Sequence, residues 1–436
     1  MYFIKVIFCA FFSCVFYTSS HGAGVPRPPI IPSLDESARW KAISTSVNEF
    51  GFDFHRRISE IMKGYNVVFS PYSLFMAFST VCVGARGNTR KEMMETLKWG
   101  KDKKFTKYIN SWSKNMASSS AGGNAAELLS ANKVWVSNKK DILSKYVNIL
   151  QDRFDVDIEK INLANPTQTE KEINDWVGEQ TRQNIKNLFP SGSINAMTRL
   201  IIVNAIYFKG KWAETFKKEK SRKGVFCLMN SNANCLRKYP GTGNSAEGPN
   251  EVPVTYMMKQ GKFPFSYGKH DKDADVLELP YNGPFSMFFL KPVDAKNGIK
   301  TVEEKMSSEY LNELIDRLQK TQIVLQIPKF KMEQEYNLEG TLMKMGDLFD
   351  ANRADLSGIN GRRNDLYVSD AIHKAKLTVD EEGTEAAAVT GIQIQSRSRP
   401  PSFELNRPFL FYIMHRPTKT VIFSGKMMQP KDESDV

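Results

Sequence analysis

The sequence predicts an α+β protein with extensive β-sheet. Helical spacing of apolar residues dominates the first half of the chain, apolar strand-like runs dominate the second half, and no repeat with a period of about 20–50 residues is visible. The 436 residues suffice for one large domain or two ordinary ones. The 41% hydrophobic and 25% charged content is that of a soluble globular protein, and the formal charge of +12 makes anionic partners plausible.

Residues 1–22 have the pattern of a secretory signal peptide. Lys5 gives a basic start, residues 6–18 are almost wholly apolar, and small residues follow, so we expect cleavage near Ser20 or Gly22. A membrane anchor is the alternative, but the run is short for a span and no later segment approaches that length. We therefore expect a secreted, extracellular protein with an extended tail over 23–37, one folded domain over 38–430 and a C-terminal tail over 431–436.

Three cysteines remain once the leader is removed. Cys227 and Cys235 flank a short polar stretch, as in a bridged hairpin, and secretion would permit a disulfide between them. Cys82 lies in an apolar run and is expected to be a buried free thiol. No cluster of histidine and cysteine has the spacing of metal ligands, so no metal or other cofactor is expected.

The first half of the chain contains most of the predicted helices. Apolar spacing predicts a helix over 38–62, and a short strand over 66–69 leads to Ser70 and Pro71, which are a typical cap and first-turn residue for the next helix. We also expect an amphipathic helix over 105–116, a strand over 128–136 and a helix over 142–154.

The second half contains most of the predicted strands. The most apolar strand covers 200–208 and is followed by a long polar loop over 231–250, for which we assign no function. Further strands are expected over 276–279, 286–290, 323–327, 409–414 and 421–424, and helices over 301–318 and 338–348.

The amphipathic segment 105–116 carries lysines opposite its apolar stripe. Lys103, Lys107 and Lys114 form this basic row, which is the pattern of a solvated helix, and we favour that interpretation.

Signatures of catalysis are missing from the sequence. There is no Gly-x-Ser-x-Gly elbow, no phosphate-binding glycine loop and no His-Glu-x-x-His motif. His373 lies in a strand-like context, where a lone histidine is more often a hydrogen-bonded core residue than a general base. We therefore expect that the protein is not an enzyme.

The stretch 379–401 could be either a loop or a strand. Read with a period of two, Thr384, Ala386, Ala388, Thr390, Ile392 and Ile394 share one face, which is small at its start, apolar at its end and free of charge. A fixed central strand is nevertheless disfavoured by Gly383, by the alanine run and by the Ser-Arg-Ser-Arg-Pro-Pro tail.

Four motifs show that the chain resembles the serpin family over roughly residues 40–430. They are Asn66-Val67-Val68-Phe69-Ser70-Pro71-Tyr72-Ser73-Leu74, Asn204-Ala205-Ile206-Tyr207-Phe208-Lys209-Gly210-Lys211-Trp212, His373-Lys374-Ala375 through Asp380-Glu381-Glu382-Gly383-Thr384-Glu385-Ala386-Ala387, and Phe403-Glu404-Leu405-Asn406-Arg407-Pro408-Phe409. The resemblance implies three β-sheets, about nine helices and an exposed reactive-centre loop at about 381–402. It also implies a suicide mechanism, in which a protease cuts the loop, forms an acyl-enzyme and is trapped when the cut loop inserts into the largest sheet.

The resemblance assigns roles to individual residues. The reactive bond would be Arg397–Ser398, with Arg399 as the runner-up, and arginine there fits a trypsin-like protease. The hinge would comprise Glu381, Gly383, Thr384, Glu385, Ala386, Ala387 and Ala388. Ser70, Ser73, Asn204 and His373 match a polar cluster where the sheet opens, and Trp212, Lys329 and Glu381 match positions where the loop enters it, with an ion pair expected between the last two.

Two further functions remain as alternatives to a secreted inhibitor of trypsin-like serine proteases. One is a non-inhibitory serpin acting as carrier, chaperone or storage protein. The other is a serpin that binds heparin or another glycosaminoglycan, because the resemblance places Lys103, Lys107 and Lys114 on a helix that binds heparin in some serpins. The expected partners are a protease and, as a candidate, a glycosaminoglycan, with no nucleic acid and no membrane, and we expect a monomer.

Overall fold

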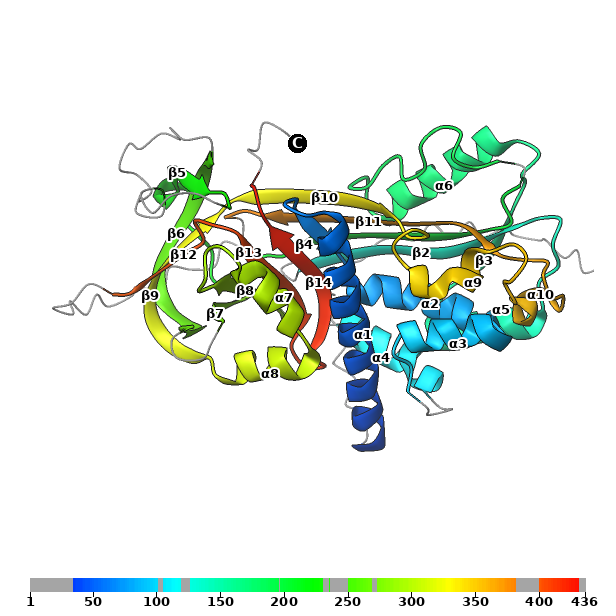
Figure 1. Ribbon diagram of the computed structural model, residues 1–436, viewed down its shortest axis with the longest axis horizontal. Helices are drawn as coiled ribbons and strands as arrows, with labels where there is room; N and C mark the ends of the chain where they lie inside the picture. The colour runs from blue at the N-terminus through cyan, green and yellow to red at the C-terminus, as the bar shows by residue number, and fades with distance from the viewer. Residues whose placement is uncertain are drawn as a thin grey trace, which may run out of the picture.

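The computed structural model describes residues 34–100, 105–118, 126–195, 197–229, 235, 250–268, 273–381 and 400–430. Strands and helices both contribute throughout this part of the chain, which confirms the α+β class. Two sheets form the framework, and the helices cover them (Figure 1).

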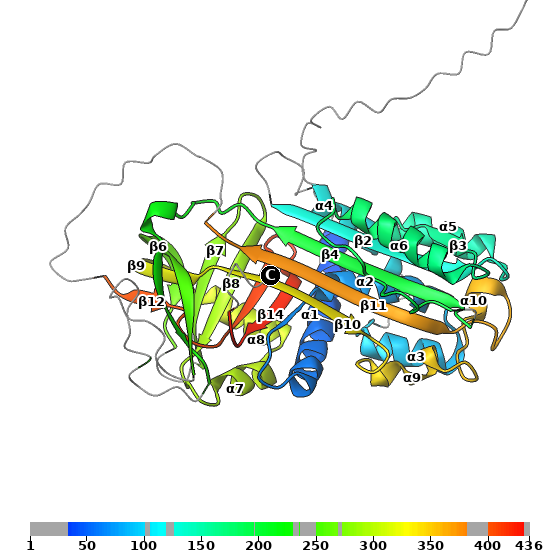
Figure 2. The same cartoon turned by 90° about the horizontal axis from the view of Figure 1, so that it is seen from above.

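The five-stranded sheet has the order β10-β11-β4-β2-β3, and its four longest strands run side by side in Figure 2. The pairs β10–β11 and β4–β2 are antiparallel, whereas β11–β4 and β2–β3 are parallel. The strands are β2 (Glu127–Ser137), β3 (Ile158–Ile161), β4 (Leu200–Lys209), β10 (Phe330–Asn337) and β11 (Val368–Val379).

β4 is buried on both faces, which explains its nearly continuous apolar sequence. Ile202, Ile206 and Phe208 belong to the large core that includes α2, whereas Val203 and Ala205 belong to a smaller core with α6. The alternation follows the period of two of a strand. Asn204 therefore faces α2, and it is the polar residue that interrupts the apolar run.

The second sheet has nine strands, with the order β1-β14-β13-β8-β7-β6-β9-β12 and β5 paired to β6. We expected three sheets, but hydrogen bonding joins the described strands into two because the 16-residue β6 pairs with β5, β7 and β9 along its length. The strands are β1 (Val67–Phe69), β5 (Arg222–Cys227), β6 (Glu251–Ser266), β7 (Ala274–Pro280), β8 (Phe285–Pro292), β9 (Gln319–Pro328), β12 (Ser402–Glu404), β13 (Phe409–His415) and β14 (Thr420–Met427).

Ten α-helices are described, two of them only four residues long, where the resemblance implied about nine. They are α1 (Leu34–Ile61), α2 (Pro71–Gly84), α3 (Gly87–Thr96), α4 (Ile109–Ser118), α5 (Ser144–Phe154), α6 (Pro166–Gln180), α7 (Gly298–Lys305), α8 (Ser308–Asp316), α9 (Gly346–Phe349) and α10 (Ser357–Asn360). In Figure 1, α6 lies on one side of the five-stranded sheet and α2, α3, α5 and α9 lie on the other. Short 3-10 turns are η1 (Phe105–Tyr108), η2 (Lys218–Lys220) and η4 (Met343–Met345).

Three helix predictions differ from the structure. The expected helix over 301–318 is divided into α7 and α8, because extended backbone at Ser307 lets its hydroxyl cap α8 by accepting a bond from the Tyr310 N–H (3.1 Å). The expected helix over 338–348 is reduced to η4 and α9, in a stretch where Gly340 and Gly346 disfavour helix. The helix expected over 38–62 already begins at Leu34, inside the segment 23–37 for which an extended tail was expected.

Candidate functional site: the parting line of the five-stranded sheet and the start of its loop

The parallel pair β4–β11 lies in the middle of the five-stranded sheet. Their register runs from Leu200 opposite Val368 to Lys209 opposite Thr378, so both strands end together. The chain continues from β11 through Asp380 and Glu381 directly into residues 382–399, which lie outside the described residues. The hinge from Gly383 onward and the reactive bond Arg397–Ser398 are therefore not described, and their roles stay predictions.

A buried polar cluster joins the two parallel strands, and it contains the four residues that the family resemblance grouped. His373 and Asn204 are register partners across β11 and β4, and Nδ1 of His373 is bonded to Oδ1 of Asn204. The Asn204 amide donates to the backbone oxygen of Ser73 (2.9 Å) and to its Oγ (2.6 Å). Ser70 and Ser73 come from the start of α2, where Ser70 is the N-cap that the Ser-Pro pair predicted.

Hydrogen bonding fixes the protonation of His373. The backbone N–H of Ser70 donates to Nε2 of His373 (3.1 Å), so this nitrogen carries the lone pair. The ring proton is then on Nδ1 and is donated to Asn204. Complete burial lowers the pKa of His373 to about 3, because the charged ring would lose its hydration. His373 is thus a neutral structural histidine, as its strand context predicted.

Sequence reasoning missed two members of this cluster. Asn132 on β2 lies opposite Asn204 and accepts a bond from the Ser73 hydroxyl (3.2 Å), and the ring of Tyr336 on β10 is stacked on that of His373 with centroids 6.2 Å apart. The residues Tyr336, His373, Asn204 and Asn132 form one row across four neighbouring strands. Only the register of the sheet reveals this row, because local spacing within each strand does not.

The stability of the protein is expected to fall in mild acid partly because of His373. Its folded-state pKa of about 3 lies below the ordinary 6.5, so the unfolded chain binds the proton first. The stabilisation is complete above pH 6.5 and is lost at about 1.4 kcal/mol per pH unit as the pH falls toward 3. Urea unfolding from pH 7 to 5 should show a shallower decline for His373→Gln than for the wild type. Parallel declines would contradict this assignment. His415, whose pKa burial lowers to about 4, contributes equally in both proteins.

The chain is held firmly where it leaves β11. The Trp212 indole N–H donates to the backbone oxygen of Asp380 (2.8 Å), and the Trp212 ring is stacked on Tyr281 at 4.3 Å. Glu381 is buried, and its Oε2 lies 3.1 Å from Nζ of Lys329, which is the ion pair that the family resemblance suggested. Trp212, Lys329 and Glu381 thus meet at the last described residues before the loop.

Ser221 is a further contact at this point that the sequence analysis missed. Its hydroxyl donates to Oε1 of Glu381 (2.7 Å). Despite the desolvation that opposes it, the bonds from Ser221 and Lys329 lower the pKa of Glu381, so this buried carboxylate stays charged. Glu381 is therefore fixed by two partners from different parts of the chain.

Comparison with known proteins identifies the family. The model of the serpin family, described as serine protease inhibitor, matches residues 45–430. The chain belongs to the serpin family. The family's description as inhibitors agrees with the expectation that this serpin is not an enzyme.

Relatives and solved structures support the same assignment. The serpin is 34% identical to the leukocyte elastase inhibitor of Xenopus tropicalis over 89% of this chain and 99% of that protein. It is 33% identical to mouse antithrombin-III over 92% of this chain and 84% of that protein. The structure of uncleaved ovalbumin is similar with a TM-score of 0.78 at 26% identity, covering 89% of this chain and 100% of that one. The structure of mouse protein-Z-dependent protease inhibitor is similar with a TM-score of 0.77 at 25% identity, covering 92% of this chain and 100% of that one.

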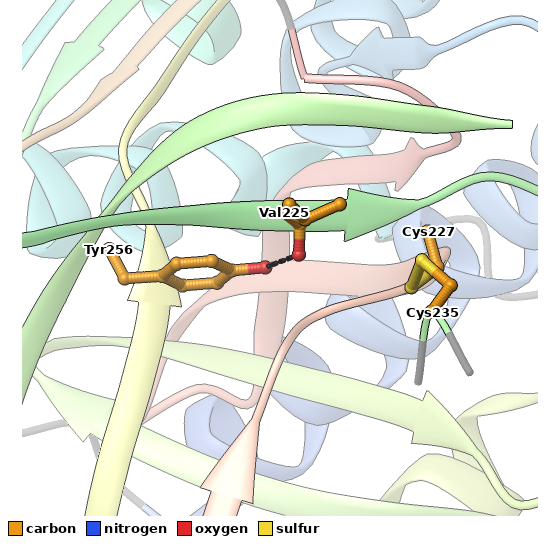
Figure 3. The surroundings of a disulfide bond; sticks show 4 residues. All are labelled: Val225, Cys227, Cys235 and Tyr256. Carbon is orange, nitrogen blue, oxygen red and sulfur yellow. Dashed lines mark hydrogen bonds between the residues drawn. A yellow bond between two sulfur atoms is a disulfide. The ribbon is translucent and has the colours of Figure 1, made fainter. Parts of the chain in front are cut away.

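Cys227 and Cys235 of this serpin form a disulfide, as their spacing predicted (Figure 3). Both sulfur-bearing residues are buried in a small cluster with Val225, whose backbone oxygen accepts a bond from the Tyr256 hydroxyl (2.9 Å). The Cys227 N–H donates to the backbone oxygen of Asn406 (2.8 Å). The bridge therefore lies next to Asn406, in the chain that follows residues 382–399. Cys82 is a buried free thiol, as expected.

Removing this disulfide should destabilise the serpin. Cross-linking residues eight positions apart restricts the unfolded chain, which corresponds to about 2–3 kcal/mol. We expect Cys227→Ala/Cys235→Ala to lower the free energy of unfolding by that amount in urea titrations. The reduced wild type provides the matched comparison and should unfold like the double variant. Equal stability of the oxidised and reduced proteins would contradict the prediction.

The candidate glycosaminoglycan lysines are only partly described. The apolar stripe of the segment is buried as predicted, at Phe105, Ile109, Trp112 and Met116. Lys107 and Lys114 are exposed, and Nζ of Lys114 lies 3.7 Å from Asp155, whereas Lys103 lies outside the described residues. Exposed pairs of this kind contribute little energy, so the contact neither supports nor removes a binding role.

The described residues contain neither a candidate metal site nor a candidate membrane span. Within the described part of the chain no group of His, Cys, Asp and Glu could hold a metal ion. None of the described helices is long and apolar enough to cross a membrane.

Proposed function

We propose that this serpin is a secreted suicide inhibitor of trypsin-like serine proteases, cut at Arg397–Ser398 and acting by insertion of its loop between β4 and β11. The observation that carries the proposal is the parallel β4–β11 pair in mid-sheet, with the loop beginning directly after β11. The loop sequence supplies a small, uncharged inward row that suits a buried strand.

The geometry of the pair favours insertion of this loop. A segment that follows β11 must reverse direction to lie beside it, so the new strand would run antiparallel to both β11 and β4. One parallel pairing would be exchanged for two antiparallel pairings, which are slightly more stable per residue. Insertion would also pair the backbone groups of the cut loop with those of β4 and β11. Burial of Ile392 and Ile394 would stabilise the inserted state by roughly 1.5–3 kcal/mol for each side chain.

Insertion would have to break hydrogen bonds of the buried polar cluster. The bond from His373 to Asn204 spans the two strands that would separate, so it cannot survive with a strand between them. Buried polar groups are costly when unpaired, so the cluster favours the closed sheet until the loop supplies replacements.

Arg397 supports the choice of protease class. An arginine at the cleaved bond can pair with a carboxylate in an acidic specificity pocket through charge-assisted bonds. The names of relatives at 33–34% identity describe inhibitors of leukocyte elastase and of coagulation, which supports protease inhibition in general terms.

Secretion is supported by residues 1–22 and by the disulfide. Disulfides persist in oxidising compartments, and the Cys227–Cys235 bridge would be kept open in most cytosols. The matched relatives include both antithrombin-III of Mus musculus and a Tachypleus tridentatus protein named intracellular coagulation inhibitor 2. Expression in a secretory host should release a protein whose N-terminus begins after residue 20 or 22. Retention of the full leader on a cell-associated product would contradict secretion.

A denaturing gel distinguishes an inhibitor from a non-inhibitory serpin. The carrier alternative is represented among similar structures by human thyroxine-binding globulin, at a TM-score of 0.76 and 26% identity. After mixing with trypsin we expect a band of serpin plus protease that survives boiling in detergent. Trypsin whose catalytic serine has been blocked should give none. Cleaved serpin without the larger band would refute the inhibitor and favour a carrier, chaperone or storage role.

A further inference from the structure

Lys133 lies beneath α6, between two apolar neighbours on the same face of β2. These neighbours, Ala131 and Trp135, belong to the smaller core with α6. The register partner of Lys133 on β4 is Val203, which belongs to the same core. The Lys133 side chain is only 13% exposed. Lysine is rarely buried to this extent unless its ammonium has partners.

The partners of Lys133 come from three different elements. Its Nζ lies 4.4 Å from the ring centroid of Trp176 on α6 and 4.7 Å from that of Trp135 on its own strand. It also lies 2.8 Å from Oε2 of Glu159 on β3. The two indole rings meet edge to face, with their centroids 5.8 Å apart. We call these four residues, Lys133, Trp135, Glu159 and Trp176, the Lys133 cluster.

The rings contribute more to the Lys133 cluster than the carboxylate does. Glu159 is 51% exposed, so water and salt screen its pair with Lys133. Trp135 is only 3% exposed, and a cation is attracted to the face of an aromatic ring more strongly where water is excluded. Because Trp176 belongs to α6 and Trp135 to β2, the ammonium that contacts both rings attaches the helix to the sheet.

The core beneath α6 spans the line along which the loop would insert. Val203 of β4 and Ile372 of β11 are register partners, and both belong to this core. From the other side α6, which covers one face of the sheet in Figure 1, contributes Ile173 and Val177. A strand inserted between β4 and β11 would widen the sheet by about 4.8 Å and place its outward row against this cover. The helix must therefore yield while the strand enters.

We propose that Lys133 is a positioning residue for the trapping reaction, whose ammonium holds Trp176 of α6 and so limits how fast the loop inserts. Without the ammonium, Trp176 keeps only its contacts with uncharged groups, and α6 separates from the sheet more often. Insertion then becomes faster. The effect on the loop rests on the proposed function, whereas the attachment of α6 does not.

Hydrogen exchange of the full-length protein tests the attachment without any protease. Lys133→Met should speed the exchange of the α6 amides about fivefold or more, because the helix opens more often. Lys133→Arg keeps a cation that can stack on the rings and should retain slow exchange. The matched control, Lys140→Met, removes a lysine whose partner is the Asp365 carboxylate and should leave α6 exchange unchanged.

The amides of α1 are the internal reference in the same samples. A general loss of stability would speed their exchange together with that of α6, whereas loss of the attachment affects α6 alone. Exchange of α6 in Lys133→Met at the wild-type rate, or an equal increase in α1 and α6, would overturn the proposal.

A small amine distinguishes the charge of Lys133 from its shape. Lys133→Ala lacks the last three carbons and the nitrogen of the side chain, which n-propylammonium supplies. We expect millimolar n-propylammonium to restore slow α6 exchange in this variant. The uncharged n-propanol, which has nearly the same shape, should not restore it. Equal restoration by both compounds, or by neither, would overturn the role of the ammonium.

Insertion itself is measured with a fluorescent synthetic peptide of residues 384–397, added to the uncleaved protein. We expect the peptide to enter Lys133→Met about fivefold faster than the wild type, Lys133→Arg or Lys140→Met. Faster α6 exchange without faster entry would show that α6 does not limit insertion, and it would overturn the proposal. If the peptide does not enter the wild type and trypsin is not trapped, the proposed function fails together with the effect on the loop. Hydrogen exchange still decides the attachment of α6 in that case.

Discussion

Replacing Thr384 with arginine is expected to convert this serpin from an inhibitor into a substrate of trypsin. Thr384 begins the row of the loop that would face into the sheet, followed by Ala386 and Ala388. A guanidinium at that position must be buried without a partner, at a cost of several kcal/mol. Each 1.4 kcal/mol added to the insertion barrier slows insertion about tenfold, so hydrolysis of the acyl-enzyme overtakes trapping.

The measurement is the number of serpin molecules cleaved per protease molecule inhibited. This ratio should rise at least about tenfold for Thr384→Arg, and the boiled gel should show cleaved serpin in place of complex. Glu385→Arg is the matched control, because Glu385 belongs to the outward row and its replacement leaves the inward row unchanged. Similar ratios for the two variants would contradict the assignment of faces.

Replacing Arg397 with alanine is expected to abolish trypsin inhibition. The acidic group of a trypsin-like pocket is left without its charged partner, and sites built to bind a polar group reject analogues that lack it by about 10⁴-fold. The second-order rate constant for trypsin should fall by about that factor. The variant should keep its thermal midpoint if the loop side chain contributes only to recognition.

The control for this prediction is the neighbouring arginine. Arg399 precedes Pro400, which disfavours cleavage after it, so Arg399→Ala should leave the trypsin rate nearly unchanged. Loss of inhibition in Arg399→Ala, with retention in Arg397→Ala, would move the reactive bond by two residues. Both arginines lie outside the described residues, so kinetics and mass spectrometry of the cleaved protein decide between them.

Local patterns predicted the elements whose own residues determine them. The apolar run 200–208 became β4, and the Ser70-Pro71 pair became the cap and first turn of α2, because burial and capping act over a few residues. The Cys227–Cys235 bridge was predictable for the same reason. Helix ends near Ser307 and Gly340 were placed wrongly, because competing caps and glycines act against the periodicity.

Contacts between distant segments could not be derived from the residues alone. Asn132 joins the polar cluster only because β2 lies beside β4 in a particular register, and Ser221 meets Glu381 across 160 positions of sequence. Resemblance to the family supplied His373, Asn204 and the Lys329–Glu381 pair, but it supplied neither Asn132 nor Ser221. The same limit applies to the number of sheets, which depends on how far the long strand β6 extends its pairing.

The central claim is that the cut loop becomes a strand between β4 and β11, and a distance measurement tests it most directly. Spin labels are placed at Gln393→Cys, in the outward row of the loop, and at Met197→Cys, an exposed position near the start of β4. Cys82 should not interfere, because burial raises the pKa of its thiol to about 12 and keeps it unreactive.

The loop begins at the opposite end of β4, about 33 Å from the start of this strand. After cleavage by trypsin, pulsed electron resonance should show the label separation falling to within about 20 Å, because the inserted strand runs back along β4. A separation that is unchanged by cleavage would contradict insertion between these strands.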